Sequence, residues 1–113
     1  MKNIAVVLSG CGVRDGSEIH EATLLLLAID KLGAKYTIFA PNTDFKAYNH
    51  YTGNDTDEKR NILAESARIA RGDIKDLITF DATEYDALIF PGGFGAAKNL
   101  CTYAIDGVNM EVR

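Results

Sequence analysis

Two consecutive glycines, Gly92 and Gly93, stand between an apolar run and a group of helix-forming residues. Glycine adopts positive φ without a Cβ clash, so two in succession can turn their backbone N–H groups outward together and form a small positive concavity. The unpaired N–H groups at the start of the following helix would add to the same field. This order predicts an oxyanion-binding turn. The alternative is an ordinary strand-to-helix turn whose glycines only relieve strain.

A cysteine near the N-terminus, Cys11, is a candidate nucleophile. It follows a buried strand at the edge where ligands of parallel sheets gather, and it precedes a helix start that could lower its thiol pKa. The alternative is a small buried thiol in a tight glycine loop. We favour that alternative, because neither His20 nor His50 is placed by local spacing to act as the base of a thiol nucleophile.

Two acidic residues, Glu18 and Glu21, stand one turn apart at the start of the first predicted helix. That spacing places both carboxylates on one helix face, directed toward the cysteine loop. They are therefore candidates for acid–base chemistry. The alternative is that acids in a first helical turn only complement the helix dipole.

The same loop superficially resembles a dinucleotide fingerprint, with Gly10, Gly12 and Gly16 between a strand and a helix. A fingerprint needs its third glycine three residues after the second and an acid near the end of the second strand, and neither condition is met. The spacing also gives no support to a zinc site made of His20, His50, Cys11 and the glutamates. We predict no cofactor and no metal ion.

The strands and helices that position these residues are predicted from apolar runs that alternate with helical patterns. Strands are predicted over residues 4–8, 36–40 and 86–90, the first without polar alternation, as in a strand buried on both faces of a parallel sheet. Helices are predicted from an Asp15 or Ser17 cap to about Lys31, over 61–71 with Gly72 as the stop, and after the double glycine. Residues 42–59 form an insertion or an edge hairpin, 74–78 a brief extended segment, and no strong strand follows Leu100. This order predicts a doubly wound α/β fold with a thin parallel sheet.

Composition limits the cellular setting and the partners. The 113 residues are 47% hydrophobic, carry a net charge of −4 and contain two cysteines. We expect one globular domain, no nucleic-acid partner because no basic stripe is present, and no membrane span. Two distant cysteines without metal-ligand spacing favour a reducing compartment, for which we expect the cytoplasm.

Two long motifs carry a resemblance to a known family. They are NIAVVLSGCGV with DGSEIHEA, over residues 3–22, and PGGFGAAKNL, over residues 91–100. In this order they resemble the enhancing-lycopene-biosynthesis (ElbB) branch of the ThiJ/PfpI superfamily, also called class I glutamine amidotransferase-like. The resemblance covers nearly the whole chain.

The resemblance implies a flavodoxin-like three-layer sandwich and a cytosolic, often dimeric protein associated with isoprenoid biosynthesis. It also implies a glyoxalase III-type lyase that converts glyoxal or methylglyoxal to a hydroxy acid without glutathione, so the expected partner is a small aldehyde. In this family a glutamate on the first helix bonds to a nucleophilic cysteine. Glu21 matches that glutamate better, and Glu18 is the second choice; Gly92 and Gly93 match the oxyanion turn.

One family feature has no counterpart in this sequence. The family's nucleophilic cysteine lies on a strand-to-helix elbow well downstream of the glycine turn, and neither Cys11 nor Cys101 is on such an elbow. We therefore expect residues 1–113 to be the N-terminal part of a single ThiJ/PfpI-like domain, inactive by itself. The alternative is a non-catalytic member that binds a metabolite or a protein in the same pocket.

Overall fold

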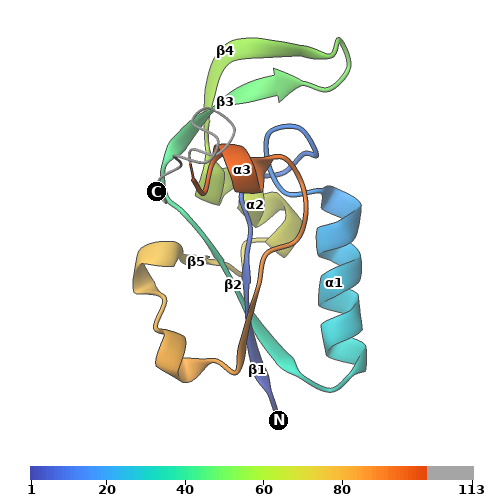
Figure 1. Ribbon diagram of the computed structural model, residues 1–113, viewed down its shortest axis with the longest axis vertical. Helices are drawn as coiled ribbons and strands as arrows, with labels where there is room; N and C mark the ends of the chain where they lie inside the picture. Colours follow the sequence, from blue (N-terminus) through green and yellow to red (C-terminus); the bar gives the residue numbers. More distant parts are fainter. Residues whose placement is uncertain (102–113) are drawn as a thin grey trace.

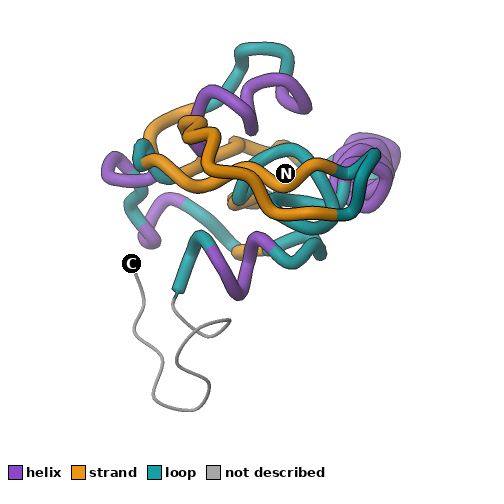
Figure 2. The backbone as a smooth tube through the Cα atoms, turned by 90° about the horizontal axis from the view of Figure 1, so that it is seen from above, coloured by secondary structure: helices purple, strands orange, loops and turns teal. Residues whose placement is uncertain are grey.

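A four-stranded parallel sheet forms the centre of the molecule. The computed structural model describes residues 1–101, and its strand order is β5-β2-β1-β6. The strands are β1 (Asn3–Val7), β2 (Lys35–Ala40), β5 (Lys75–Asp76) and β6 (Ala87–Ile89). Figure 1 shows β1 and β2 side by side along the long axis, and Figure 2 shows the strands as a central layer with helical segments on both sides. The predicted parallel α/β architecture is confirmed.

Side chains of β1 alternate between two hydrophobic clusters on opposite faces of the sheet. Val6 and Leu8 pack with Ala22 and Ile29 of helix α1 (Ile19–Lys31), while residues of helix α2 (Ile62–Ala70) border the same cluster. Ala5, Val7 and Phe39 pack on the other face, against the segment that holds two short 3-10 helices, η1 (Leu77–Thr79) and η2 (Ala82–Glu84). Both faces of β1 are thus covered, which explains its uninterrupted apolar run.

Helix α1 begins at a different cap from either predicted one. Glu18 is the N-cap, and its carboxylate accepts hydrogen bonds from the backbone N–H groups of His20 and Glu21 at 3.1 and 2.8 Å. The expected caps are engaged elsewhere: Ser17 Oγ accepts from Ser9 N at 2.9 Å, and Asp15 Oδ2 accepts from Tyr48 N at 2.7 Å. Tertiary hydrogen bonds therefore decide which of three neighbouring polar residues caps this helix.

The polar excursion is an antiparallel hairpin, the second of the two predicted alternatives. Its strands are β3 (Asp44–Asn49) and β4 (Asn54–Asn61), and it projects beyond the end of the sheet (Figure 1). Helix α2 follows directly, with the Asn61 side chain accepting from Ala64 N at 2.8 Å. Its left-handed C-cap is Arg71, with φ +57°, one residue before the glycine predicted as the stop.

The remaining elements are shorter than the sequence pattern indicates. The predicted extended segment over 74–78 is a two-residue strand followed by η1, and the strand predicted over 86–90 is the three-residue β6. Helix α3 (Gly95–Lys98) follows the glycine turn as expected. The prediction that no strong strand follows Leu100 concerns residues 102–113, which lie outside the described residues. Within residues 1–101, no helix is long and apolar enough to cross a membrane.

Candidate active site

Two loops meet at the carboxyl end of the sheet, where β1 and β6 finish. The loop from Ser9 to Glu18, which we call the first loop, joins β1 to α1, and residues 90–94, which hold the double glycine, join β6 to α3. Figure 1 shows both beside the start of α1, at the end of the sheet opposite the N-terminus. Backbone hydrogen bonds join them: Glu18 N donates to Gly92 O, Phe94 N to Val13 O at 2.7 Å, and Gly95 N to Gly16 O at 3.0 Å.

The glycine turn lies directly against Glu21. A Cβ placed on Gly92 would lie 3.0 Å from Cδ and 3.1 Å from Oε2 of Glu21, with Oε1 closer still. Gly93 has φ +122°, and a Cβ there would lie 2.6 Å from Glu18 N. The structure therefore brings together the three residues that the resemblance assigns to catalysis. The contact at Gly92 is with the end of the Glu21 side chain, whereas backbone atoms leave Gly93 no room for a side chain.

The turn presents two backbone donors. Among residues 1–101, neither Gly92 N–H nor Gly93 N–H donates a hydrogen bond, whereas the N–H groups of the next two residues are bonded to the first loop. The peptides that follow are thus held in place, while within residues 1–101 these two N–H groups have no acceptor. Paired, fixed N–H donors of this kind are what stabilises a developing oxyanion.

The two candidate glutamates have different environments. The Glu18 carboxylate is occupied as the helix cap, and the hydrogen bonds from Glu21 N–H and then His20 N–H lower its pKa. The Glu21 side chain is exposed and makes no hydrogen bond or ion pair with another residue in the described part of the chain. Glu21 is therefore the carboxylate that is available for proton transfer.

Cys11 does not have the properties of an activated nucleophile. Burial raises the pKa of its thiol, and the negative charge of Glu65 raises it further, so the lowering that a nearby helix start could produce is not found. Helix α1 begins only at Ile19, and the Glu18 carboxylate accepts hydrogen bonds from the N–H groups of His20 and Glu21. Cys101 lies just beyond α3, where its Sγ contacts Ala96 O at 3.5 Å and Ala97 O at 3.7 Å.

The side chains of the two histidines bond to residues outside the glycine turn. His20 Nδ1 lies 3.1 Å from Glu18 Oε1, and His50 Nε2 accepts from Arg14 N at 3.2 Å. Within residues 1–101, no three His, Cys, Asp or Glu side chains form a group that could hold a metal ion.

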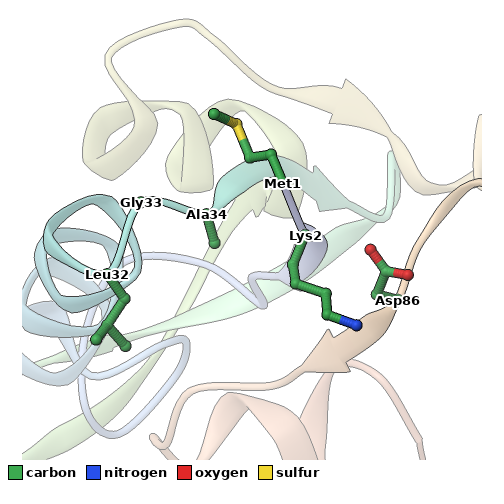
Figure 3. Close-up of a pocket in the computed structure, with 6 residues that line it drawn as sticks. All are labelled: Met1, Lys2, Leu32, Gly33, Ala34 and Asp86. Atoms are coloured by element: carbon green, nitrogen blue, oxygen red, sulfur yellow. The ribbon is translucent and has the colours of Figure 1, made fainter.

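A cavity lies at the opposite end of the sheet. It has a volume of about 450 Å³ and is lined by residues that precede the strands: Met1, Lys2, Leu32, Gly33, Ala34 and Asp86 (Figure 3). Ligands of parallel α/β sheets bind outside the carboxyl ends of the strands, so this cavity does not belong to the site at the glycine turn.

Comparison with known proteins identifies the fold and several similar proteins. No family model matches the chain. A crystal structure titled as an isoprenoid biosynthesis protein with an amidotransferase-like domain, from Ehrlichia chaffeensis, superposes with a TM-score of 0.90 at 43% identity, covering 97% of this chain and 52% of that one. The human glutamine amidotransferase-like class 1 domain-containing protein 3, mitochondrial, is 53% identical over 111 residues, which are 96% of this chain and 41% of the relative. Over nearly its whole length, this chain is therefore similar to glutamine amidotransferase-like class 1 proteins.

The other relatives show the same similarity. The rat ES1 protein homolog, mitochondrial, is 53% identical over 111 residues, and the zebrafish ES1 protein, mitochondrial, is 42% identical over 116. The amidotransferase-like chain spans less than half the length of these curated relatives, 41% to 43%. The predicted resemblance and the flavodoxin-like fold are confirmed.

The predicted cytoplasmic location is wrong, because all three of these relatives are named mitochondrial. Free cysteines indicate a reducing compartment, and that property does not distinguish the cytoplasm from other reducing compartments.

Proposed function

We propose that this chain supplies the acid and the oxyanion-binding turn of a glyoxalase III-type lyase acting on glyoxal or methylglyoxal. The observation that carries the proposal is the contact between the Glu21 carboxylate and a turn whose two N–H groups make no hydrogen bond within residues 1–101. A carboxyl group beside paired donors is the arrangement needed for an aldehyde that becomes an alkoxide while a proton moves.

The reaction needs no oxidant. A cysteine thiol adds to the aldehyde carbon, and the resulting alkoxide is held by the N–H groups of Gly92 and Gly93 and takes up a proton. A base then moves the proton from the former aldehyde carbon to the neighbouring carbonyl carbon, while the hydroxyl proton passes to the oxygen of that neighbouring carbonyl; the product is a hydroxyacyl thioester. Water hydrolyses the thioester, releasing the hydroxy acid and restoring the thiol. Glu21 is suited to carry the transferred proton because it is exposed beside the turn.

The nucleophile comes from the part of the relatives' length that this chain does not span. Cys11 is a poor candidate because its thiol pKa is raised by burial. Because neither Cys11 nor Cys101 lies on a strand-to-helix elbow, the second candidate function is binding of a small metabolite or a protein partner at the same turn without chemistry.

The test measures the loss of methylglyoxal and the formation of lactate in the absence of glutathione. It compares the 113-residue chain, a longer form that restores the length of the relatives, and Cys11→Ala in each. We expect the longer form to be active, the short chain to be inactive, and Cys11→Ala to change neither. Activity of the short chain that Cys11→Ala abolishes would contradict the proposed source of the nucleophile. No activity in the longer form would favour the non-catalytic function.

A further inference from the structure

We propose that Asn99 is a positioning residue of this site, whose side-chain amide holds the first loop in register with the glycine turn. The proposal deepens the proposed function and rests on it for the identity of the site. Asn99 follows α3, and it touches neither of the two groups assigned to the chemistry.

The Asn99 side chain bonds to both arms of the first loop, an arrangement that we call the Asn99 clamp. Asn99 is 3% exposed, and its Nδ2 donates to Ser9 O and to Asp15 O, both at 2.7 Å. An amide NH₂ group has two hydrogens, so both are used on this one loop. Ser9 begins the first loop and Asp15 lies near its far end, so one side chain fixes both arms of the loop.

Backbone hydrogen bonds also fix this register, because the two segments meet backbone to backbone: Glu18 N donates to Gly92 O, Phe94 N to Val13 O and Gly95 N to Gly16 O. A Cβ on Gly95 would lie 2.6 Å from Ser9 Oγ and 2.7 Å from the carbonyl carbon of Gly16. No large side chain fits in this contact, so hydrogen bonds, including the two from Asn99, set the relative position of the segments. Removing a buried donor from two carbonyls leaves both unsatisfied, which is costly.

A displacement of the first loop would reach the reacting groups directly. The loop ends at Glu18, whose carboxylate caps the helix that carries Glu21 and whose N–H donates to Gly92 O. The loop also accepts the N–H groups of Phe94 and Gly95. Loss of the clamp would therefore move the acid and the oxyanion turn relative to one another, and catalysis is sensitive to shifts of about 1 Å.

The experiment compares Asn99→Asp with Asn61→Asp in the longer form of the protein. Each substitution replaces an amide NH₂ by oxygen at nearly constant volume. Asn61 caps α2 through its oxygen, which aspartate retains, and within residues 1–101 its Nδ2 bonds only to Asn42 Oδ1, at 2.8 Å. Hydrogen-exchange mass spectrometry follows a peptide over residues 91–98 and a strand peptide over residues 3–8.

In Asn99→Asp we expect exchange over residues 91–98 to accelerate at least about tenfold more than exchange over residues 3–8. We also expect kcat for methylglyoxal to fall with little change in KM. Asn61→Asp should show neither effect. If Asn99→Asp does not fold, Asn99→Ser, which keeps one donor, is measured with the same expectation.

Equal acceleration in both peptides, or none over residues 91–98, would overturn the proposal. Selective acceleration in a protein that does not consume methylglyoxal would support the positioning role of Asn99 and refute the lyase function. The two proposals can therefore fail separately.

Discussion

Gly93 combines a left-handed backbone with complete lack of space for a side chain. Its φ is +122°, and a Cβ would collide with Gly16 O and lie 2.6 Å from Glu18 N, both of them backbone atoms that cannot rotate away. Gly33 also has positive φ, +78°, but no atom lies within 4 Å of its Cβ position. A substitution at Gly33 therefore measures the cost of backbone strain alone, whereas one at Gly93 adds the cost of steric overlap.

We expect Gly93→Ala to lower the free energy of unfolding by more than about 3 kcal/mol and Gly33→Ala by about 1 to 2 kcal/mol. Equilibrium urea unfolding of the longer form measures both. Equal losses would show that the first loop moves away from the turn at little cost, contrary to the tight backbone contact described above.

The Cys11 thiol should be unreactive at neutral pH. Burial raises its pKa above the ordinary value of 9.0, so little thiolate forms near pH 7.5. In a Cys101→Ser background we expect alkylation of Cys11 by iodoacetamide to be slower in the folded protein than in urea at the same pH. Alkylation that is faster in the folded protein would indicate a lowered pKa and return Cys11 to the list of nucleophiles.

At the scale of elements, the N-terminus of α1 should show a characteristic response to acid. The hydrogen bonds from Glu21 N–H and His20 N–H lower the folded-state pKa of Glu18 below the ordinary 4.5. The unfolded chain then binds the proton more readily, so the cap's contribution is complete above about pH 4.5 and is lost as pH falls through the lower folded-state pKa. Glu18→Gln should reduce the pH dependence of the free energy of unfolding in that acidic range.

Glu84→Gln is the matched control for this measurement. It removes the same charge from a short helical turn in which the carboxylate accepts no hydrogen bond from a residue of the described chain. We expect its profile to follow that of the unmodified protein. Identical profiles for Glu18→Gln and Glu84→Gln would contradict the capping role.

The elements that could be predicted are those whose buried apolar residues recur at the spacing typical of a strand or a helix. The strand at residues 4–8 and the helix up to Lys31 follow from apolar patterning, and the glycine turn follows from its place between strand and helix. The cap of α1 could not be chosen, because hydrogen bonds from Ser9 of the first loop and from Tyr48 of the hairpin occupy Ser17 and Asp15. The Asn99 clamp could not be found either, because its partners lie 90 and 84 residues away in sequence.

At the scale of the whole molecule, helix α1 retains an uncovered apolar face. Leu24 and Leu27 are 63% and 52% exposed. Among the described strands, β5 and β6 are the edges of the sheet, and β6 has only three residues. Each exposed leucine forgoes about 1.5 to 3 kcal/mol of burial, which is a large part of the ~5 to 15 kcal/mol stability of a typical domain.

We therefore expect the isolated, monomeric 113-residue chain to melt without a cooperative transition, while the longer form melts cooperatively. Differential scanning calorimetry at several concentrations distinguishes a monomer from a self-associated state, including the homodimer that the family resemblance implies for the longer form. A cooperative, concentration-independent transition of the short chain would show that these residues fold without further cover.

The central claim is that Glu21 and the glycine turn act together in catalysis. The most direct test is the steady-state rate of glutathione-free methylglyoxal conversion by the longer form with Glu21→Gln, compared with Glu84→Gln as a charge-matched control. The Glu21 side chain is exposed and makes no hydrogen bond within residues 1–101, so the substitution should leave stability unchanged. We predict that Glu21→Gln lowers kcat by about 10² to 10⁴-fold while Glu84→Gln has no effect; an unchanged kcat in Glu21→Gln would contradict the account.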